Sequence, residues 1–221
     1  MKLGFDPWLH SIAECERLAA ACGKAGAELV SLEGNPVDAV WADQPPPPLG
    51  PVASHSLDYA GEESAAKRQR IAAELKKSKA DAAVLSLPDS IAWLLNIRGA
   101  DVPHVPLPLS FAVLHADAQV DLFIDPRKLT EEARQHLGNQ VSVQPPEALE
   151  AVLEGLGRAK RTVLVDPASA PYRLASRLQS AGARLVREAD PVALPEACKN
   201  PVEIAGTRRA HARDGAALSR F

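Results

Sequence analysis

Cysteine is scarce in this chain of 221 residues, and the few cysteines form no recognisable site. Cys15, Cys22 and Cys198 are odd in number and include no C-x-x-C pair, which argues against both a disulfide framework and a zinc knuckle. Cys15 and Cys22 stand seven residues apart on an expected helix, about 10 Å along its axis, which is too far for a bridge. We therefore expect both to be small buried side chains in a reducing compartment.

The chain also lacks an excess of positive charge and any long apolar run. Its net charge of -3 is not what proteins that track nucleic-acid phosphates usually carry. No stretch approaches the roughly 20 apolar residues needed to cross a bilayer, and the opening "MKLGFDPW" has no apolar core of a secretory signal. We expect a cytoplasmic protein that binds neither nucleic acid nor membrane.

One basic run does stand out, at residues 67–70 and again at 76, 77 and 79. It lies on a helical pattern among glutamates at 62, 63 and 74. Runs of this kind are typical of a solvated helix face, and that is the interpretation we favour.

Signatures of metal binding and of nucleophilic catalysis are missing. None of the six histidines stands three to five residues from another, and neither H-E-x-x-H nor G-x-S-x-G occurs. The segment "GLGRAK" at 155–160 follows an expected helix and precedes an expected strand, the reverse of a phosphate loop. The sequence therefore predicts no catalytic residue and no metal ligand in this chain.

What is present is an alternation of helical and strand patterns on either side of a proline run. Residues 3–41 predict strand, helix and strand, with the helix from Ser11 to Gly23. Four consecutive prolines follow, Pro45 to Pro48, and such a run stiffens into an extended spacer. We place a linker at 45–56, after a partial α/β domain at 1–44. A docking ligand for an aromatic groove is the less favoured alternative.

The region 57–193 predicts an α/β fold in which a mixed β-sheet is covered by helices on both faces. Helical spacing occurs at 62–79, 128–137, 149–156 and 170–181, and strand patterns occur in "DAAVLSL", "QVSVQ", "RTVLVD" and "ARLVRE". The stretch "SFAVLHADAQVDLFID" predicts a hairpin, so the sheet should be mixed. Residues 194–221 hold a last helix, with Pro201 and Glu203 in its first turn.

The candidate site is a bend within "DSIAWLLNIRGADVPHVPLPLSFAVLHAD", Asp89 to Asp117. Arg98 follows a helical pattern and precedes a glycine, so its guanidinium could offer a planar fork to a carboxylate. On spacing alone the favoured alternative is that Arg98 pairs with Asp101 or caps helix carbonyls.

Three separated stretches resemble the aminopeptidase P (Xaa-Pro aminopeptidase) family. "SIAWLLNIRGADVPHVPLPLSFAVL" resembles its middle domain, which carries a W-L-L-N-[IL]-R-G-x-D-V-P stretch. "GFDPWLH" with "NPVDAVWADQPPPP" resembles the end of its first domain and the linker. "ACKNPVEIAGTRRAHARDGAALSRF" resembles the entry into its catalytic domain. The likeness spans essentially the whole chain in family order.

The resemblance implies an enzyme that removes an N-terminal residue preceding proline. It implies a creatinase N-terminal-like fold for 57–193 and a catalytic pita-bread domain that binds two divalent ions, usually manganese, through two Asp, one His and two Glu. By resemblance these ligands lie downstream of Phe221, and part of the first domain precedes Met1. His211 belongs to the helix motif and is not a metal ligand.

By resemblance, the bend with Arg98 and Trp93, together with Asp101 and His104, faces substrate or a neighbouring domain. The expected partners are proline-containing peptides in the full-length enzyme and either the chain's own catalytic domain or a second copy in a homodimer. We expect the chain itself to be inactive. Two alternatives stay open: a standalone peptide- or protein-binding module without hydrolytic activity, and a relative in the creatinase or prolidase branch.

Overall fold

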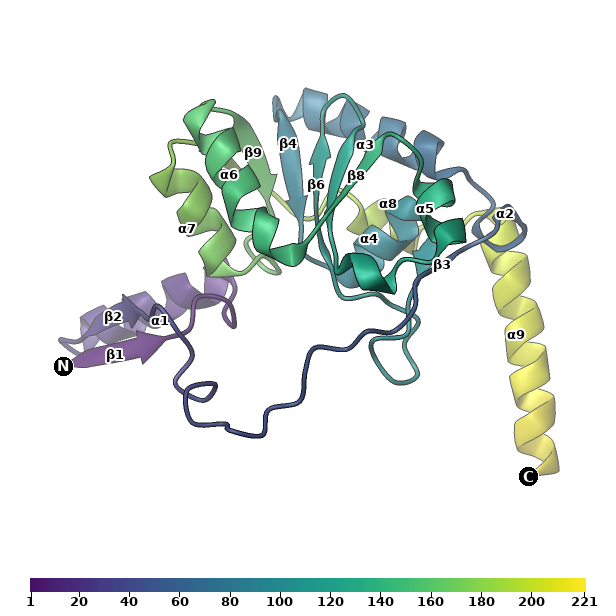
Figure 1. Cartoon of the computed structure of the whole chain (residues 1–221), viewed down its shortest axis with the longest axis horizontal. Coiled ribbons are helices and arrows are strands. Elements are labelled where there is room, and N and C mark those ends of the chain that lie inside the picture. Colours follow the sequence, from purple (N-terminus) through teal and green to yellow (C-terminus); the bar gives the residue numbers. More distant parts are fainter.

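A six-stranded mixed sheet forms the centre of the molecule. The computed structural model describes all 221 residues, and the sheet has the strand order β10-β9-β4-β6-β7-β8 (Figure 1). The strands are β4 Ala82–Leu85, β6 Phe111–His115, β7 Val120–Phe123, β8 Val141–Gln144, β9 Thr162–Val165 and β10 Arg184–Arg187. β6 runs antiparallel to β4 and β7, while the pairs β4–β9, β9–β10 and β7–β8 are parallel. The predicted mixed sheet and the β6–β7 hairpin are thereby confirmed.

Helices cover both faces of this sheet, as predicted. On one face lie α3 Ser64–Lys77, α4 Pro88–Leu95 and α5 Glu131–Leu137; on the other lie α6 Leu149–Arg158 and α7 Tyr172–Ser180. Successive side chains of β4 point to opposite faces, so that Ala83 and Leu85 join the first core and Val84 joins the second. Six shorter elements complete this region: β3 Ala53–Ser54, α2 Leu57–Ala60, β5 Ile97–Arg98, α8 Ala193–Ala197 and the 3₁₀ turns η1 Pro126–Lys128 and η2 Pro146–Ala148. The strands β3 and β5 pair with each other.

The segment 155–160 comprises the last turn of α6 and the turn that follows it before β9, so the order is helix then strand, as predicted. Gly157 lies in α6, and a Cβ there would come within 2.3 Å of the Ala181 side chain. Glycine therefore lets α6 approach the end of α7 closely.

The basic run on α3 is only partly solvated, which corrects the sequence-based interpretation. Lys67 is 1% exposed and Arg68 5% exposed, while Arg70, Lys76 and Lys77 stay at the surface. Both cations can be buried because backbone carbonyls accept their hydrogen bonds. The Lys67 ammonium donates to the Trp93 carbonyl (3.0 Å), and the Arg68 guanidinium donates to the Ala118 carbonyl (2.7 Å). Helical periodicity could not show that these carbonyls lie within reach.

A small unit of β1 Lys2–Phe5, α1 Ile12–Lys24 and β2 Glu28–Ser31 stands beside α7. Its two strands are parallel, and a capping box between Ser11 and Glu14 starts the helix. The helix continues one residue past Gly23, where the sequence had suggested its end. Cys15 and Cys22 are buried, as predicted, and all three cysteines are free.

From residue 32 to residue 51 the chain forms no helix and no strand. Regular pairing resumes at Val52, whose N–H donates to the Lys128 carbonyl (2.8 Å), and continues in β3. The domain limits proposed from the sequence stay a prediction. Beyond α8, the helix α9 Pro201–Arg220 extends away from the sheet (Figure 1). No helix combines the length and the apolar character that crossing a membrane requires.

Candidate functional site

The bend begins at the end of α4, where Asn96 organises the backbone. Pro88 at the first helical turn and Asp89 beside it favour the helix start. Asn96 ends the helix in the left-handed conformation (φ 51°), which asparagine tolerates. Its amide donates to the Glu62 carbonyl (2.8 Å), and its side-chain oxygen accepts from Lys67 Nζ (2.8 Å). α3, α4 and the bend are thus tied together at one buried residue.

Arg98 is held by a short strand pair. β5 pairs antiparallel with β3, so that Arg98 stands opposite Ala53. Ile97 is fully buried and Arg98 half-buried, as alternation along a strand requires. The Arg98 guanidinium donates to the Ile97 carbonyl (2.8 Å) and, at 3.4 Å, to the carbonyl of Ala92 in α4. Carbonyl capping, one of the two favoured alternatives, is therefore found, and pairing with Asp101 is not.

Asp101 supports the bend from within. Its side chain is fully buried and forms an ion pair with Lys128 Nζ at 2.7 Å. It also accepts hydrogen bonds from the N–H groups of Gly50 (3.0 Å) and Leu109 (2.7 Å). Asp101 thereby joins the linker, the bend and η1, and it does not reach the same hollow as Arg98.

His104 lies apart from the other three predicted residues. It sits exposed in the loop 99–106 with a φ of 65°. It lines a shallow depression formed by that loop alone, together with Gly99 and Pro106. The structure therefore brings Trp93 and Arg98 together and places Asp101 and His104 elsewhere.

The first turn of α9 docks on the bend. Asn200 and Glu203 form a capping box, and the Asn200 amide donates to the carbonyl of Ala60 in α2 (2.8 Å). The indole N–H of Trp93 donates to Glu203 Oε1 at 3.1 Å, and Glu203 Oε2 accepts from the Asn200 N–H at 2.8 Å. Both Glu203 oxygens are thus used, and they fix α9 to α4.

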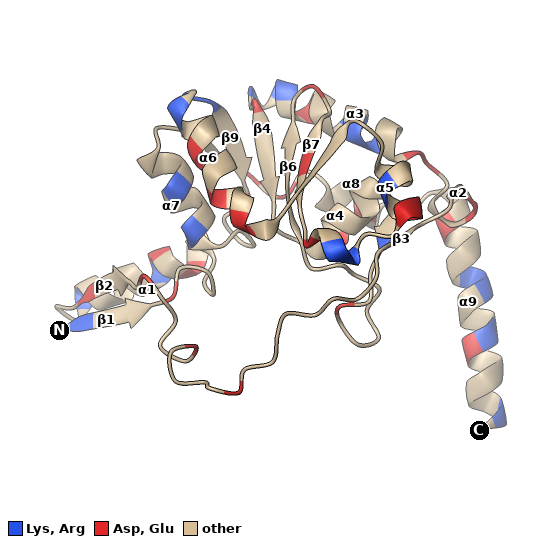
Figure 2. Ribbon diagram, viewed as in Figure 1, with Lys and Arg blue, Asp and Glu red and all other residues tan.

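Between the bend and α9 lies a pocket of about 600 Å³, which we call the bend pocket. Its floor and one wall come from residues before α8: His55, Tyr59, Trp93, Arg98 and Pro106. The opposite wall comes from the segment 196–213, of which the charged residues are Glu196, Lys199, Glu203, Arg209 and Arg213. Figure 2 shows that basic residues recur along α9. A pocket of this size is within the range of small-ligand sites.

The cations around the bend pocket shift the protonation of its neighbours. Burial, reinforced by the charges of Arg98 and Lys67, lowers the pKa of His55 to about 4. His55 is therefore neutral at pH 7. Burial also lowers the pKa of Lys67 to about 8, against the favourable charge of Glu203. The Lys67 ammonium lies 4.0 Å from the centre of the Trp93 ring, so a cation–π contact helps to keep it charged.

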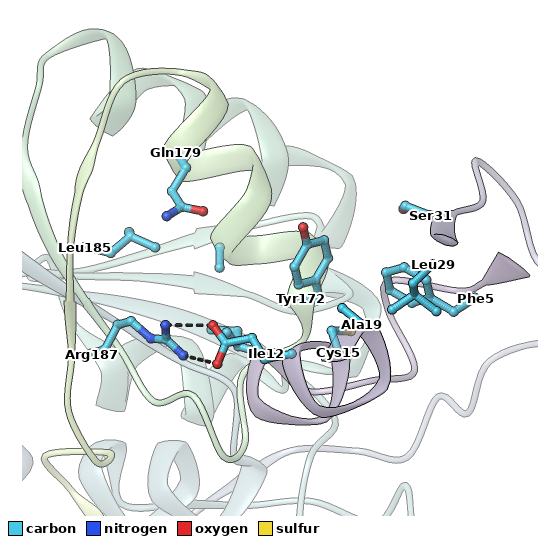
Figure 3. Close-up of a pocket in the computed structure, with 12 residues that line it drawn as sticks. Phe5, Ile12, Cys15, Ala19, Leu29, Ser31, Tyr172, Gln179, Leu185 and Arg187 are labelled. Atoms are coloured by element: carbon cyan, nitrogen blue, oxygen red, sulfur yellow. Dashed lines mark hydrogen bonds and ion pairs between the residues drawn. The ribbon is translucent and has the colours of Figure 1, made fainter. Parts of the chain in front are cut away.

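A second cavity, of about 320 Å³, separates the β1–α1–β2 unit from α7 and β10 (Figure 3). Its lining is mostly apolar and includes Phe5, Cys15 and Tyr172. The ion pair between Arg187 and Glu16, at 2.7 Å, crosses from β10 to α1. Because these charges already satisfy each other, the cavity presents no free charge to a ligand, and the bend pocket is the stronger candidate.

The two-metal centre that the resemblance implies does not fit these residues. No group of three or more His, Cys, Asp or Glu side chains could hold a metal ion. In the bend pocket the only carboxylates are Glu196 and Glu203, and the latter already accepts two hydrogen bonds.

Several pocket residues were missed by the sequence analysis. His55 and Tyr59 stack with ring centres 5.7 Å apart. His55 falls in the expected linker and Tyr59 three residues after its end, and no spacing marks either of them. Glu203 was recognised only as a first-turn residue. The Asn-x-x-Glu spacing from Asn200 signals a capping box, but nothing in the sequence shows that the same carboxylate accepts from Trp93.

Comparison with known proteins gives a consistent result. Residues 43–203 match the family model described as the creatinase/prolidase N-terminal domain. The chain is 38% identical over 228 residues to a probable Xaa-Pro aminopeptidase P of Aspergillus niger and 37% identical over 231 residues to one of Coccidioides posadasii. Each alignment covers 99% of this chain but only 37% and 35% of the relative. The chain thus spans little more than a third of the curated relatives it matches.

Solved structures agree with these matches. The crystal structure of X-prolyl aminopeptidase from Caenorhabditis elegans, described as a cytosolic enzyme with a di-nuclear active site, superposes with a TM-score of 0.90 at 32% identity. The match covers 100% of this chain and 36% of the other. A Xaa-Pro dipeptidase from Bacillus anthracis, with a TM-score of 0.51 at 14% identity over 65% of this chain and 38% of the other, shows the shared fold alone.

Proposed function

Because the chain belongs to the family of creatinase/prolidase N-terminal domains, we propose that it is the non-catalytic portion of a cytoplasmic Xaa-Pro aminopeptidase. In this proposal it supports substrate access and assembly beside a catalytic domain, and it is inactive alone. The two divalent ions, manganese by resemblance, belong to that catalytic domain. A homodimer or the catalytic domain itself is the proposed protein partner.

One observation carries the proposal: the Trp93 indole and the capping box of α9 share the carboxylate of Glu203. This bond fixes the direction in which α9 leaves the bend. A catalytic domain attached through α9 would therefore have a set orientation relative to Arg98 and the bend pocket. Trp93 and Arg98 are the residues we assign to the substrate side. Asp101 holds the bend in shape, and His104 offers an exposed contact to a neighbouring domain.

The first test uses the chain by itself. Incubation with Mn²⁺ and an Xaa-Pro peptide is expected to release no N-terminal residue, and calorimetric titration with Mn²⁺ is expected to show no tight uptake. Turnover above background, or stoichiometric tight binding of two ions, would overturn the assignment of a non-catalytic portion.

The second test uses a full-length Xaa-Pro aminopeptidase that carries this segment. Arg98→Gln is expected to raise KM for a proline-containing peptide or to weaken the assembly, measured by steady-state kinetics and analytical ultracentrifugation. Arg17→Gln, at an exposed position of α1, is the matched control and should change neither. If Arg98→Gln also leaves both unchanged, the bend has no part in substrate access or assembly.

A standalone binding module without hydrolytic activity is a second candidate. It is favoured by the bend pocket itself, whose volume of about 600 Å³ is within the range of small-ligand sites. Sequencing the gene beyond codon 221 separates the two. An open frame that continues into Asp, His and Glu motifs supports the aminopeptidase, and a stop codon with a folded product supports the module.

A further inference from the structure

The bend pocket carries more positive than negative side chains. Its cations are Arg98, Lys199, Arg209 and Arg213, and its carboxylates are Glu196 and Glu203. This excess stands out in a chain whose net charge is -3. Burial and the nearby charge of Asp89 also raise the pKa of Glu196. The pocket therefore presents a positive potential to a ligand.

None of these four cations forms a salt bridge within the chain. Glu196 and Glu203 act on Arg98 through their charges alone, without direct contact. The hydrogen bonds of Arg98 and of Lys199 go to backbone carbonyls. Both oxygens of Glu203 are occupied by Trp93 and by a backbone N–H. A half-buried guanidinium without a carboxylate partner can bind the carboxylate of a ligand.

The wall that faces these cations carries flat, ring-containing side chains. His55 stacks on Tyr59, with ring centres 5.7 Å apart, and His55 is neutral because its pKa is lowered to about 4. Trp93 and Pro106 add two further rings to the lining. Such surfaces pack against the apolar body of a ligand, while a charged group fixes its orientation.

We propose that the bend pocket binds the terminal carboxylate of a short peptide, with Arg98 as the main anchor and Arg209 as the second cation. This inference rests on the proposed function, because the choice of a peptide as the ligand comes from that function. The carboxylate end is the part of a substrate farthest from the N-terminal bond that a catalytic domain would cleave. The pocket would then favour short peptides, whose two ends reach both sites at once.

A carboxylate fits this pocket better than a phosphate does. Phosphates in proteins are commonly held by free backbone N–H groups at a helix N-terminus. At the start of α9 these donors are taken, because the N–H groups of Val202 and Glu203 donate to the side-chain oxygen of Asn200 at 2.9 and 3.0 Å. What is left is side-chain cations. The planar forks of the three arginines match a carboxylate as well as a phosphate, and the peptide class of the proposed function selects the carboxylate.

The test measures binding to the 221-residue chain itself. Calorimetry compares the tripeptide Ala-Pro-Ala as the free acid with its C-terminal amide, and inorganic phosphate serves as a competitor. We expect the amide to bind about tenfold more weakly or worse, because it loses a charge-assisted hydrogen bond. Equal binding of acid and amide overturns the proposal, and so does phosphate that displaces the acid at a lower concentration than the peptide itself requires.

Variants locate the site. Arg98→Gln and Arg209→Gln should each weaken binding of the free acid at least severalfold and leave the amide nearly unchanged, while Arg17→Gln should change neither. Arg209 is exposed and makes no hydrogen bond in the structure, so Arg209→Gln keeps the test valid if Arg98→Gln unfolds. Binding that neither variant affects would place the carboxylate elsewhere and refute the proposal.

The outcome is distinct from that of the proposed function. If acid and amide bind equally while Arg98→Gln still raises KM in the full-length enzyme, the carboxylate site is wrong and the aminopeptidase assignment stands. If the chain selects the acid but Arg98→Gln leaves kinetics and assembly of the full-length enzyme unchanged, the carboxylate site stands and the role of the bend in the enzyme is wrong.

Discussion

The buried ion pair between Asp101 and Lys128 gives the sharpest prediction about stability. Both side chains are almost fully buried, at 0% and 6% exposure, with 2.7 Å between Asp101 Oδ2 and Lys128 Nζ. Oδ2 also accepts from the Leu109 N–H, and Oδ1 accepts from the Gly50 N–H. An asparagine at this position has one acceptor oxygen and one donor nitrogen, so one of these contacts must become donor against donor.

The best arrangement for Asp101→Asn keeps its oxygen toward Lys128 and Leu109 and loses the bond to Gly50. The Lys128 ammonium then stays buried without a counter-charge. Removing one partner of a buried pair typically costs about 3–5 kcal/mol, against a total stability of about 5–15 kcal/mol for a domain. We expect a loss of that order in the free energy of unfolding, together with loosening of the bend.

Urea unfolding followed by circular dichroism measures this loss. The double variant with Lys128→Met should recover part of it, because the unpaired cation is gone, and the double-mutant cycle should give a coupling of about 2 kcal/mol or more. Glu74→Gln is the control, since its pair with Lys77 is exposed and should be worth under about 1 kcal/mol. A loss below about 1 kcal/mol for Asp101→Asn, or simple additivity in the cycle, would refute the reasoning.

Three further predictions concern the same region. Arg98→Gln should raise the pKa of His55 from about 4 toward its ordinary value of 6.5, which an NMR titration of the imidazole chemical shifts measures. An unchanged pKa would mean that the charge of Arg98 does not act on His55. Because burial lowers the pKa of Lys67 from 10.5 to about 8, the unfolded state binds more protons between these values, and stability should rise with pH across that window. Lys67→Met should abolish that rise in urea unfolding, and an unchanged slope would contradict the assignment. Gly99→Ala should destabilise the bend, since a Cβ would lie 2.5 Å from the Pro108 nitrogen; an unchanged midpoint of thermal unfolding would show that the loop gives way freely.

The sequence by itself determined the α/β class, the mixed sheet and the hairpin. These follow from local patterns: the continuous apolar run of β4 is typical of a buried strand, and the amphipathic helices place apolar residues on one face. The family resemblance followed in the same way, because the stretch around Arg98 and the stretch around Asn200 are each contiguous in the chain.

Only the tertiary structure decided which side chains share the candidate site. Lys67 lies on a charged stretch of helix that is typical of a solvated face, and it became buried because carbonyl and amide oxygens 26 and 29 residues away accept its hydrogen bonds. Asp101 forms its ion pair with Lys128 and not with Arg98. The indole N–H of Trp93 donates to Glu203, 110 residues away. Such pairings depend on how helices and strands pack against one another, and the spacing of residues along the chain does not predict that packing.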